Sequence, residues 1–174
     1  MNFGIFSILY SLTSFVISNA GIILQMVGSW FVFRKMGMPG WKGIIPFYST
    51  YVLFDKLWDT KTFWRMIIYL GVMIGATVFG FIFIMLGGVF LANGSNVAGI
   101  IFLINGIVMM IGSIVMAILM VVLEYRLYQR LAAAFGLKNG WAWGLLFVPF
   151  IMLPIIGFHK RIVYYGPVSQ VPSY

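Results

Sequence analysis

Three long stretches of this chain carry no charged residue, and they constrain the fold more than any other feature. They cover residues 3–33, 66–91 and 97–123. Each is long enough to cross a bilayer, because a spanning helix needs about 20 mostly apolar residues. With 63% hydrophobic and 8% charged residues, the 174-residue chain has too few polar side chains to cover a soluble globule. We therefore expect an all-α, polytopic integral membrane helix bundle with three transmembrane helices.

Two shorter apolar segments lie between and after these stretches. Residues 43–54 are too few to span and are interrupted by Pro46, which predicts a short interfacial or re-entrant helix. Residues 141–158 are long enough for a fourth span but contain Pro149 and Pro154. A fourth crossing would place the basic residues after it outside, against the positive-inside rule. We expect the fourth span from its length, and a re-entrant hairpin stays open as the alternative.

The domain organisation follows from these segments. We expect residues 1–163 to form a single membrane domain, since no polar linker divides them. Residues 164–174 contain two prolines and no long apolar run, which predicts an extended tail.

All eleven Lys and Arg residues lie beside the expected spans, and the connection at 92–96 has none. The positive-inside rule then places the N-terminus and this connection outside and the basic loops in the cytoplasm, as in a multi-pass protein of the plasma membrane. The six tryptophans lie near the basic groups, where an indole sits at the headgroup level. This placement of the +8 charge indicates the lipid bilayer as partner and argues against nucleic acid.

The basic loops form a candidate cytoplasmic face for anionic lipids or for a partner membrane subunit. Its members come from the end of the first span, the loop after it and the region following the third span: Arg34, Lys35, Lys42, Arg126, Arg130 and Lys138.

Small and polar residues recur within the spans. The first and third stretches carry them at heptad spacing, and Gly71 and Gly75 form a GxxxG pair in the second, as in close helix packing. A buried amide must find a hydrogen-bond partner. This partner is either a group on a neighbouring helix or a ligand bound in a polar cavity. Both explanations stay open for the candidate cavity residues Gln25, Asn105, Ser14 and Ser18.

Residues 37–54 and 136–158 share a pattern of a Gly-Trp pair, an apolar run and a Pro-Phe pair. A duplication would make the two units a parallel repeat, since both enter the turn from the same side. Chance similarity between two apolar segments that end at the interface is the alternative.

The chain is poor in residues that carry chemistry. It has three acidic residues (Asp55, Asp59 and Glu124), one histidine (His159) and no cysteine. Paired catalytic carboxylates, a metal site with three or four ligands and an activated serine are not indicated. We expect no enzyme activity, no cofactor and no metal.

The runs GWKGIIPFYSTYVLF at 40–54, LAAAFG at 131–136 and LLFVPFIMLPIIGF at 145–158 carry a resemblance. The chain resembles a family of small polytopic bacterial membrane proteins of unknown function, with the pattern W…IPFY…AFG…PF…PIIGF. Such proteins often have Asn after the Tyr, where this chain has Ser49 after Tyr48. The resemblance implies a bacterial inner-membrane protein and implies no substrate or catalytic residue.

These observations favour a non-catalytic integral membrane protein that serves as an interaction or accessory subunit of a membrane complex, with a partner subunit or as a homo-oligomer. The alternative is a small-solute or lipid transporter, or its membrane-embedded substrate-binding component. Its ligand would lie near Asn105 and the segments broken by Pro46 and Pro149.

Overall fold

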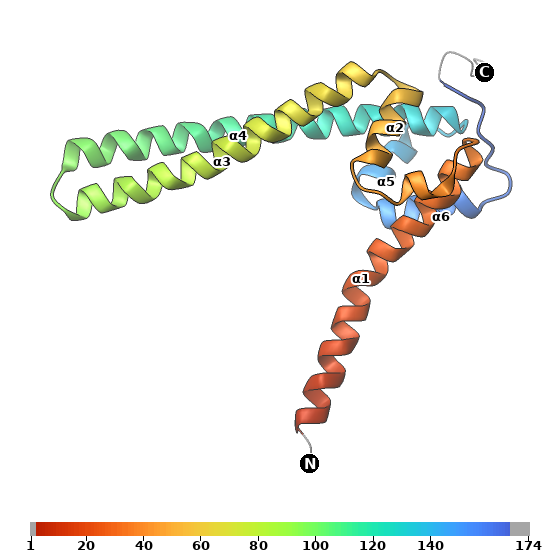
Figure 1. Ribbon diagram of the computed structural model, residues 1–174, viewed down its shortest axis with the longest axis horizontal. Helices are drawn as coiled ribbons and strands as arrows, with labels where there is room; N and C mark the ends of the chain where they lie inside the picture. Colours follow the sequence, from red (N-terminus) through yellow and green to blue (C-terminus); the bar gives the residue numbers. More distant parts are fainter. Residues whose placement is uncertain (1–2, 168–174) are drawn as a thin grey trace. The chain divides into compact units, whose positions relative to one another are not determined.

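The computed structural model describes the backbone of residues 3–167 and their side chains except those of 3–5, 15, 17 and 18. Every regular element in this range is helical, which confirms the all-α prediction (Figure 1). The elements are α1 (Phe3–Lys35), the 3-10 turn η1 (Gly40–Gly43), α2 (Tyr48–Leu57), α3 (Thr60–Ala92), α4 (Asn96–Ala134), α5 (Gly140–Phe147) and α6 (Pro149–Phe158).

Three of these helices, α1, α3 and α4, are long and apolar enough to cross a membrane. They coincide with the three predicted spans and support a multi-pass membrane protein. α4 is the longest, with 39 residues, and continues past the apolar stretch to Ala134. Its last turns therefore carry Arg126 and Arg130 beyond the apolar part of the helix.

The described residues divide into two compact units, and each is described by itself. Unit 1 comprises Met1–Asp59 with Tyr125–Tyr174, and unit 2 comprises Thr60–Glu124. The single membrane domain predicted for residues 1–163 stays a prediction. Of the predicted tail, residues 164–166 have no regular secondary structure, and residues 168–174 lie outside the described range.

Unit 2 is an antiparallel pair formed by α3 and the apolar part of α4, joined by a turn at Gly94 (Figure 1). Glycines allow the two backbones to approach, since a Cβ on Gly106 would lie 2.8 Å from the carbonyl oxygen of Gly80. The same holds one heptad away, where a Cβ on Gly87 would lie 3.0 Å from the Gly99 oxygen. The small-residue spacing in α4 thus marks the contact with α3.

In unit 1, α6 packs against the C-terminal half of α1 and runs parallel to it. Early in both segments, a Cβ on Gly21 would lie 3.8 Å from Cγ of Phe150. Near both C-termini, the ring centroids of Phe31 and Phe158 are 4.7 Å apart. Because the contacts advance in the same direction on both helices, the C-terminal ends of α1 and α6 lie at the same level.

Residues 141–158 do not form the single crossing helix expected from their length. The helix breaks at Val148, which has φ −133° and ψ 55° and separates α5 from α6. Proline at the first position of α6 is the cause, because its ring excludes the residue before it from helical conformation. α5 then packs against α6, with Met152 against Gly144. At 8 and 10 residues, neither helix is long enough to span a bilayer.

The entrance and the exit of this α5–α6 hairpin meet. The backbone N–H of Tyr165 donates to the carbonyl oxygen of Ala134 at 2.8 Å. The rings of Phe135 and Tyr164 lie 5.4 Å apart, nearly edge to face. Residues 136–163 therefore leave the end of α4 and return to it as a helical hairpin.

The segment after α1 repeats this arrangement on a smaller scale. η1 folds back along α1, since a Cβ on Gly43 would lie 2.7 Å from the carbonyl oxygen of Ser29. The chain then reverses at Pro46 and Phe47. The φ angle of Phe47 is +61°, a strained value for a bulky residue. Gly-Trp opens η1 and α5, whereas Pro-Phe lies at the start of each following ten-residue helix, α2 and α6. The sequence repeat thus corresponds to a repeated hairpin.

The core of unit 1 draws on both hairpins and on the ends of α1 and α4. Its buried members are Val32, Met36, Leu57, Leu131, Ala134, Phe135, Leu145, Leu153 and Ile156. Burial of such side chains stabilises the unit by about 1.5–3 kcal/mol each where water is the alternative environment.

The closest contact of α1 with α6 gives a test. A Cβ on Gly28 would lie 2.4 Å from the backbone nitrogen of Pro154, so Gly28→Ala forces two backbones apart. We expect it to lower the free energy of unfolding in detergent by about 1–3 kcal/mol, although alanine favours helix. Gly71→Ala is the matched control, because no atom lies within 4 Å of its Cβ position. Equal thermal unfolding shifts for the two variants would contradict the packing described.

Candidate functional site

Lys35, the last residue of α1, joins the two parallel helices at their C-terminal ends. Its Nζ donates to three backbone carbonyl oxygens, those of Ile156 at 2.7 Å, His159 at 2.7 Å and Ile162 at 2.9 Å. An ammonium group has three N–H donors, so this geometry uses all of them.

The position of Lys35 follows from helix chemistry. The last carbonyls of a helix lack partners within it, and the C-terminal end of the helix dipole favours a positive charge. Lys35 supplies both needs for α6, while its side chain remains half-buried. Lys35 was predicted to belong to the basic face, but its ammonium is occupied by these hydrogen bonds within the protein.

A second stabilising contact lies beside the hydrogen bonds of Lys35, at the point where the α5–α6 hairpin closes. Tyr164 packs its ring against Phe135 and is half-buried. This burial raises the pKa of the Tyr164 phenol, because it removes water from around the charged form. The phenol therefore stays neutral well above physiological pH.

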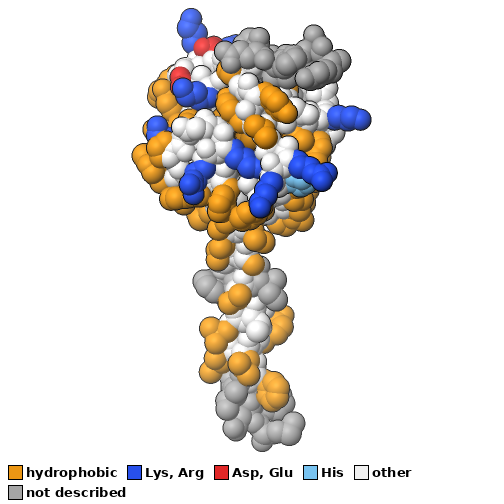
Figure 2. All heavy atoms as spheres, turned by 90° about the vertical axis from the view of Figure 1, so that its right-hand side faces the viewer, with side chains coloured by type: hydrophobic (Ala, Val, Ile, Leu, Met, Phe, Trp, Pro, Cys, Tyr) orange, Lys and Arg blue, Asp and Glu red, His pale blue; other side chains and the backbone are white. Residues whose placement is uncertain are grey.

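Three other members of the predicted basic face, Arg34, Arg126 and Lys138, are exposed. Lys42 is half-buried, with its Nζ 6.0 Å from the ring centroid of Trp41. Figure 2 shows several Lys and Arg side chains on the face that it presents, with few acidic side chains among them. All six predicted residues belong to unit 1.

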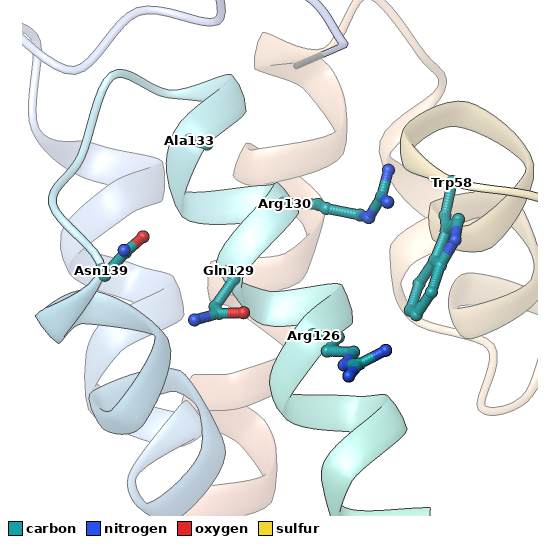
Figure 3. A pocket seen from close by; sticks show the side chains of 6 residues that line it. All are labelled: Trp58, Arg126, Gln129, Arg130, Ala133 and Asn139. Atoms are coloured by element: carbon teal, nitrogen blue, oxygen red, sulfur yellow. The ribbon is translucent and has the colours of Figure 1, made fainter. Parts of the chain in front are cut away.

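A pocket of about 450 Å³ opens beside the C-terminal turns of α4 (Figure 3). Four of its lining residues come from one face of this helix, and the others come from the end of α2 and the loop before α5. The lining residues are Trp58, Arg126, Gln129, Arg130, Ala133 and Asn139. All of them belong to unit 1.

Arg130 is held rigidly at one side of the pocket. Its guanidinium carbon lies 4.5 Å from the ring centroid of Trp58, and its Nη1 donates to the carbonyl oxygen of Leu57 at 3.2 Å. Figure 3 shows the side chain extending from α4 toward Trp58. The cation–π contact and the hydrogen bond fix the charge without neutralising it.

The remaining lining residues leave their polar groups available. Arg126 is exposed and Gln129 half-buried, and the structure gives neither a partner among the described residues. Asn139 precedes α5 at the capping position but makes no side-chain capping bond. Ala133 lines the pocket with a short side chain and lies about one turn beyond Gln129 on α4 (Figure 3). The pocket is cationic and rich in hydrogen-bond donors, and none of its lining residues is acidic.

The predicted polar cavity within the membrane is distributed over both units. Gln25 on α1 is exposed, Ser14 is half-buried, and the side chain of Ser18 lies outside the described residues. Asn105 on α4 is exposed, and its Nδ2 donates to the carbonyl oxygen of Ile101 at 2.9 Å within the same helix. Because Gln25 and Asn105 belong to different units, a cavity that includes both stays a prediction.

The sequence indicated part of the pocket and missed the rest. Arg126 and Arg130 were expected on the basic face, whereas Trp58, Gln129 and Asn139 were not expected at a site. The spacing of residues 126, 129, 130 and 133 places them on one helix face and could have indicated Gln129. Among the described residues, no three His, Asp or Glu side chains are grouped as metal ligands.

Comparisons with protein-family models, curated proteins and solved structures found no match to this chain. The resemblance to the small bacterial membrane proteins therefore stays a prediction. The functional argument depends on the geometry alone.

Replacing Lys35 tests its structural role. Lys35→Met keeps an unbranched apolar stem and removes all three hydrogen bonds to α6 and the following segment. We expect a loss of about 1–3 kcal/mol of stability in detergent, because each bond involves a charged donor but the site is partly solvated. Arg34→Met is the control at an exposed neighbour and should stay within about 0.5 kcal/mol. Thermal unfolding with equal midpoints for both variants would rule out the proposed brace.

Proposed function

We propose that this protein is a non-catalytic accessory subunit of a membrane complex, which engages a partner through its basic face. The observation that carries the proposal is that some of the six basic side chains make internal contacts whereas the others are exposed. Lys35 and Arg130 make internal contacts, and Lys42 is half-buried beside the ring of Trp41. Arg34, Arg126 and Lys138 are exposed and have no partner among the described residues.

Exposed cations of one sign favour association with a surface of opposite charge, since electrostatic complementarity guides the encounter and its orientation. The chain has eleven basic and only three acidic residues. A second copy of the chain therefore offers no matching acidic surface to this face. The proposal favours a different, acidic protein over a homo-oligomer.

The proposed orientation places the N-terminus and the α3–α4 turn outside and the basic face in the cytoplasm, at the plasma membrane. The parallel packing of α1 and α6 supports it. Lys160 and Arg161, which follow α6, then lie at the same end as Arg34, so all the basic groups of unit 1 obey the positive-inside rule together.

Cysteine labelling tests this orientation, because the chain has no native cysteine. We place single cysteines at Ser95 in the outer turn, at Lys138 between α4 and α5, and at Val163 after α6; all three positions are exposed. An impermeant maleimide applied to right-side-out vesicles should label the cysteine at 95 and neither of the others. Labelling at 163 but not at 138 would show that residues 141–158 cross the membrane.

Charge reversal tests the interaction role. We expect the protein, purified from its native membrane in mild detergent, to retain one partner at fixed stoichiometry. Arg34→Glu combined with Lys138→Glu should reduce that recovery at least about tenfold, since like charges across an interface cost several kcal/mol. Lys160→Glu, at an exposed position outside the face, is the control and should leave recovery unchanged.

A solitary monomer in this experiment would contradict the accessory role and leave transport of a small solute or lipid as the alternative. The observation that favours this alternative is the pair of helical segments broken at Phe47 and Val148. Discontinuous helices build ligand sites in many transporters.

A further inference from the structure

We propose that the pocket beside the end of α4 binds the phosphate group of an anionic ligand. The pocket residues are Trp58, Arg126, Gln129, Arg130, Ala133 and Asn139. This inference goes beyond the accessory role, because a bound phosphate is a small ligand in a pocket and requires no partner protein.

The charge and donor pattern of the pocket carries the argument. Two guanidinium groups line it, and guanidinium donors bind phosphate oxygens in pairs. The carboxamides of Gln129 and Asn139 also line the pocket and add neutral donors; Figure 3 shows them on the side of α4 away from Trp58. A cationic cavity without a lining acid leaves its positive charge to be balanced by an anion from outside the chain.

Arg130 is arranged in advance for such a ligand. Its contacts with Trp58 and with the carbonyl of Leu57 hold the side chain in place before anything binds. A donor that is already ordered loses little side-chain entropy on binding. Arg126 is exposed four residues earlier, on the same face of α4, and is free to close over the ligand.

The dimensions and the depth of the pocket fit a phosphate that carries an organic group. A volume of about 450 Å³ falls within the range of small-ligand sites and exceeds the size of a bare phosphate ion. The pocket lies where the apolar stretch of α4 has ended and where Trp58 and Trp143 belong to the aromatic belt. Lipid phosphates lie at this level, and soluble organic phosphates reach it from the adjacent water.

Binding to the purified full-length protein in neutral detergent tests the proposal by isothermal titration. The probes are dihexanoyl phosphatidylglycerol, glycerol 3-phosphate and inorganic phosphate, with dihexanoyl phosphatidylcholine as a zwitterionic comparison. We expect saturable binding of at least one anionic probe with one site per chain. Preference for the phosphatidylglycerol identifies a lipid headgroup as the source, and equal or tighter binding of glycerol 3-phosphate identifies a soluble phosphate.

Variants locate the site. Arg126→Gln should weaken the Kd of the bound probe at least about tenfold, because it removes one charged donor. Ala133→Leu should weaken it similarly by filling the pocket without changing the charge. Lys160→Gln removes one positive charge at an exposed position outside the pocket and outside the basic face, and should leave the Kd within about twofold.

Two results would overturn the proposal. One is the absence of saturable binding of all three anionic probes to a protein that retains its thermal unfolding transition. The other is a loss of affinity in Lys160→Gln that equals the loss in Arg126→Gln, together with an unchanged Kd in Ala133→Leu, which would indicate diffuse charge attraction. Partner recovery is measured separately, so the accessory role can fail while phosphate binding persists.

Discussion

The arrangement of unit 1 depends on one lysine. α6 is a ten-residue helix that contains Pro154, and its last carbonyls have no partners within the helix. The ammonium of Lys35 reaches the end of α6 from the end of α1 and donates to the carbonyl of Ile156, and also to those of His159 and Ile162 in the segment that follows. These bonds hold the two helix ends at the same level. Val32 of α1 and Ile156 of α6, which both belong to the buried core, thereby lie at matching positions.

The two hairpins explain how a chain with three helices long enough to span a membrane can build a compact unit at the ends of α1 and α4. Each hairpin leaves a long helix through a Gly-Trp pair, reverses near a proline and returns as a ten-residue helix. Returning helices bring residues from distant parts of the sequence beside the end of α4. Trp58 arrives from the first hairpin, and Asn139 lies in the loop between α4 and α5, so the pocket combines the end of α4 with residues before and after it in the chain.

The features that were predicted from the sequence are those that depend on local chemistry. Length and lack of charge decide whether a helix can span, so α1, α3 and α4 were expected with their approximate bounds. Residues 141–158 show the limit of this reasoning, because a span and a hairpin need the same apolar composition. The indications of a hairpin were Pro149 and the charges at Lys160 and Arg161, and they were outweighed by length. The bond of Lys35 to Ile156 and the pocket at Trp58 join residues too distant in sequence for any spacing rule to reveal.

The long separation between Lys35 and its acceptors has a consequence for biosynthesis. Lys35 and Ile156 are 121 positions apart, and a ribosome adds about 5–20 residues per second, so roughly 6–24 s pass before the acceptor carbonyls exist. During this interval α1 has already left the ribosome, and its terminal ammonium has to remain hydrated at the membrane surface. The end of α1 therefore enters its final environment late, when the last helix of the chain arrives beside it.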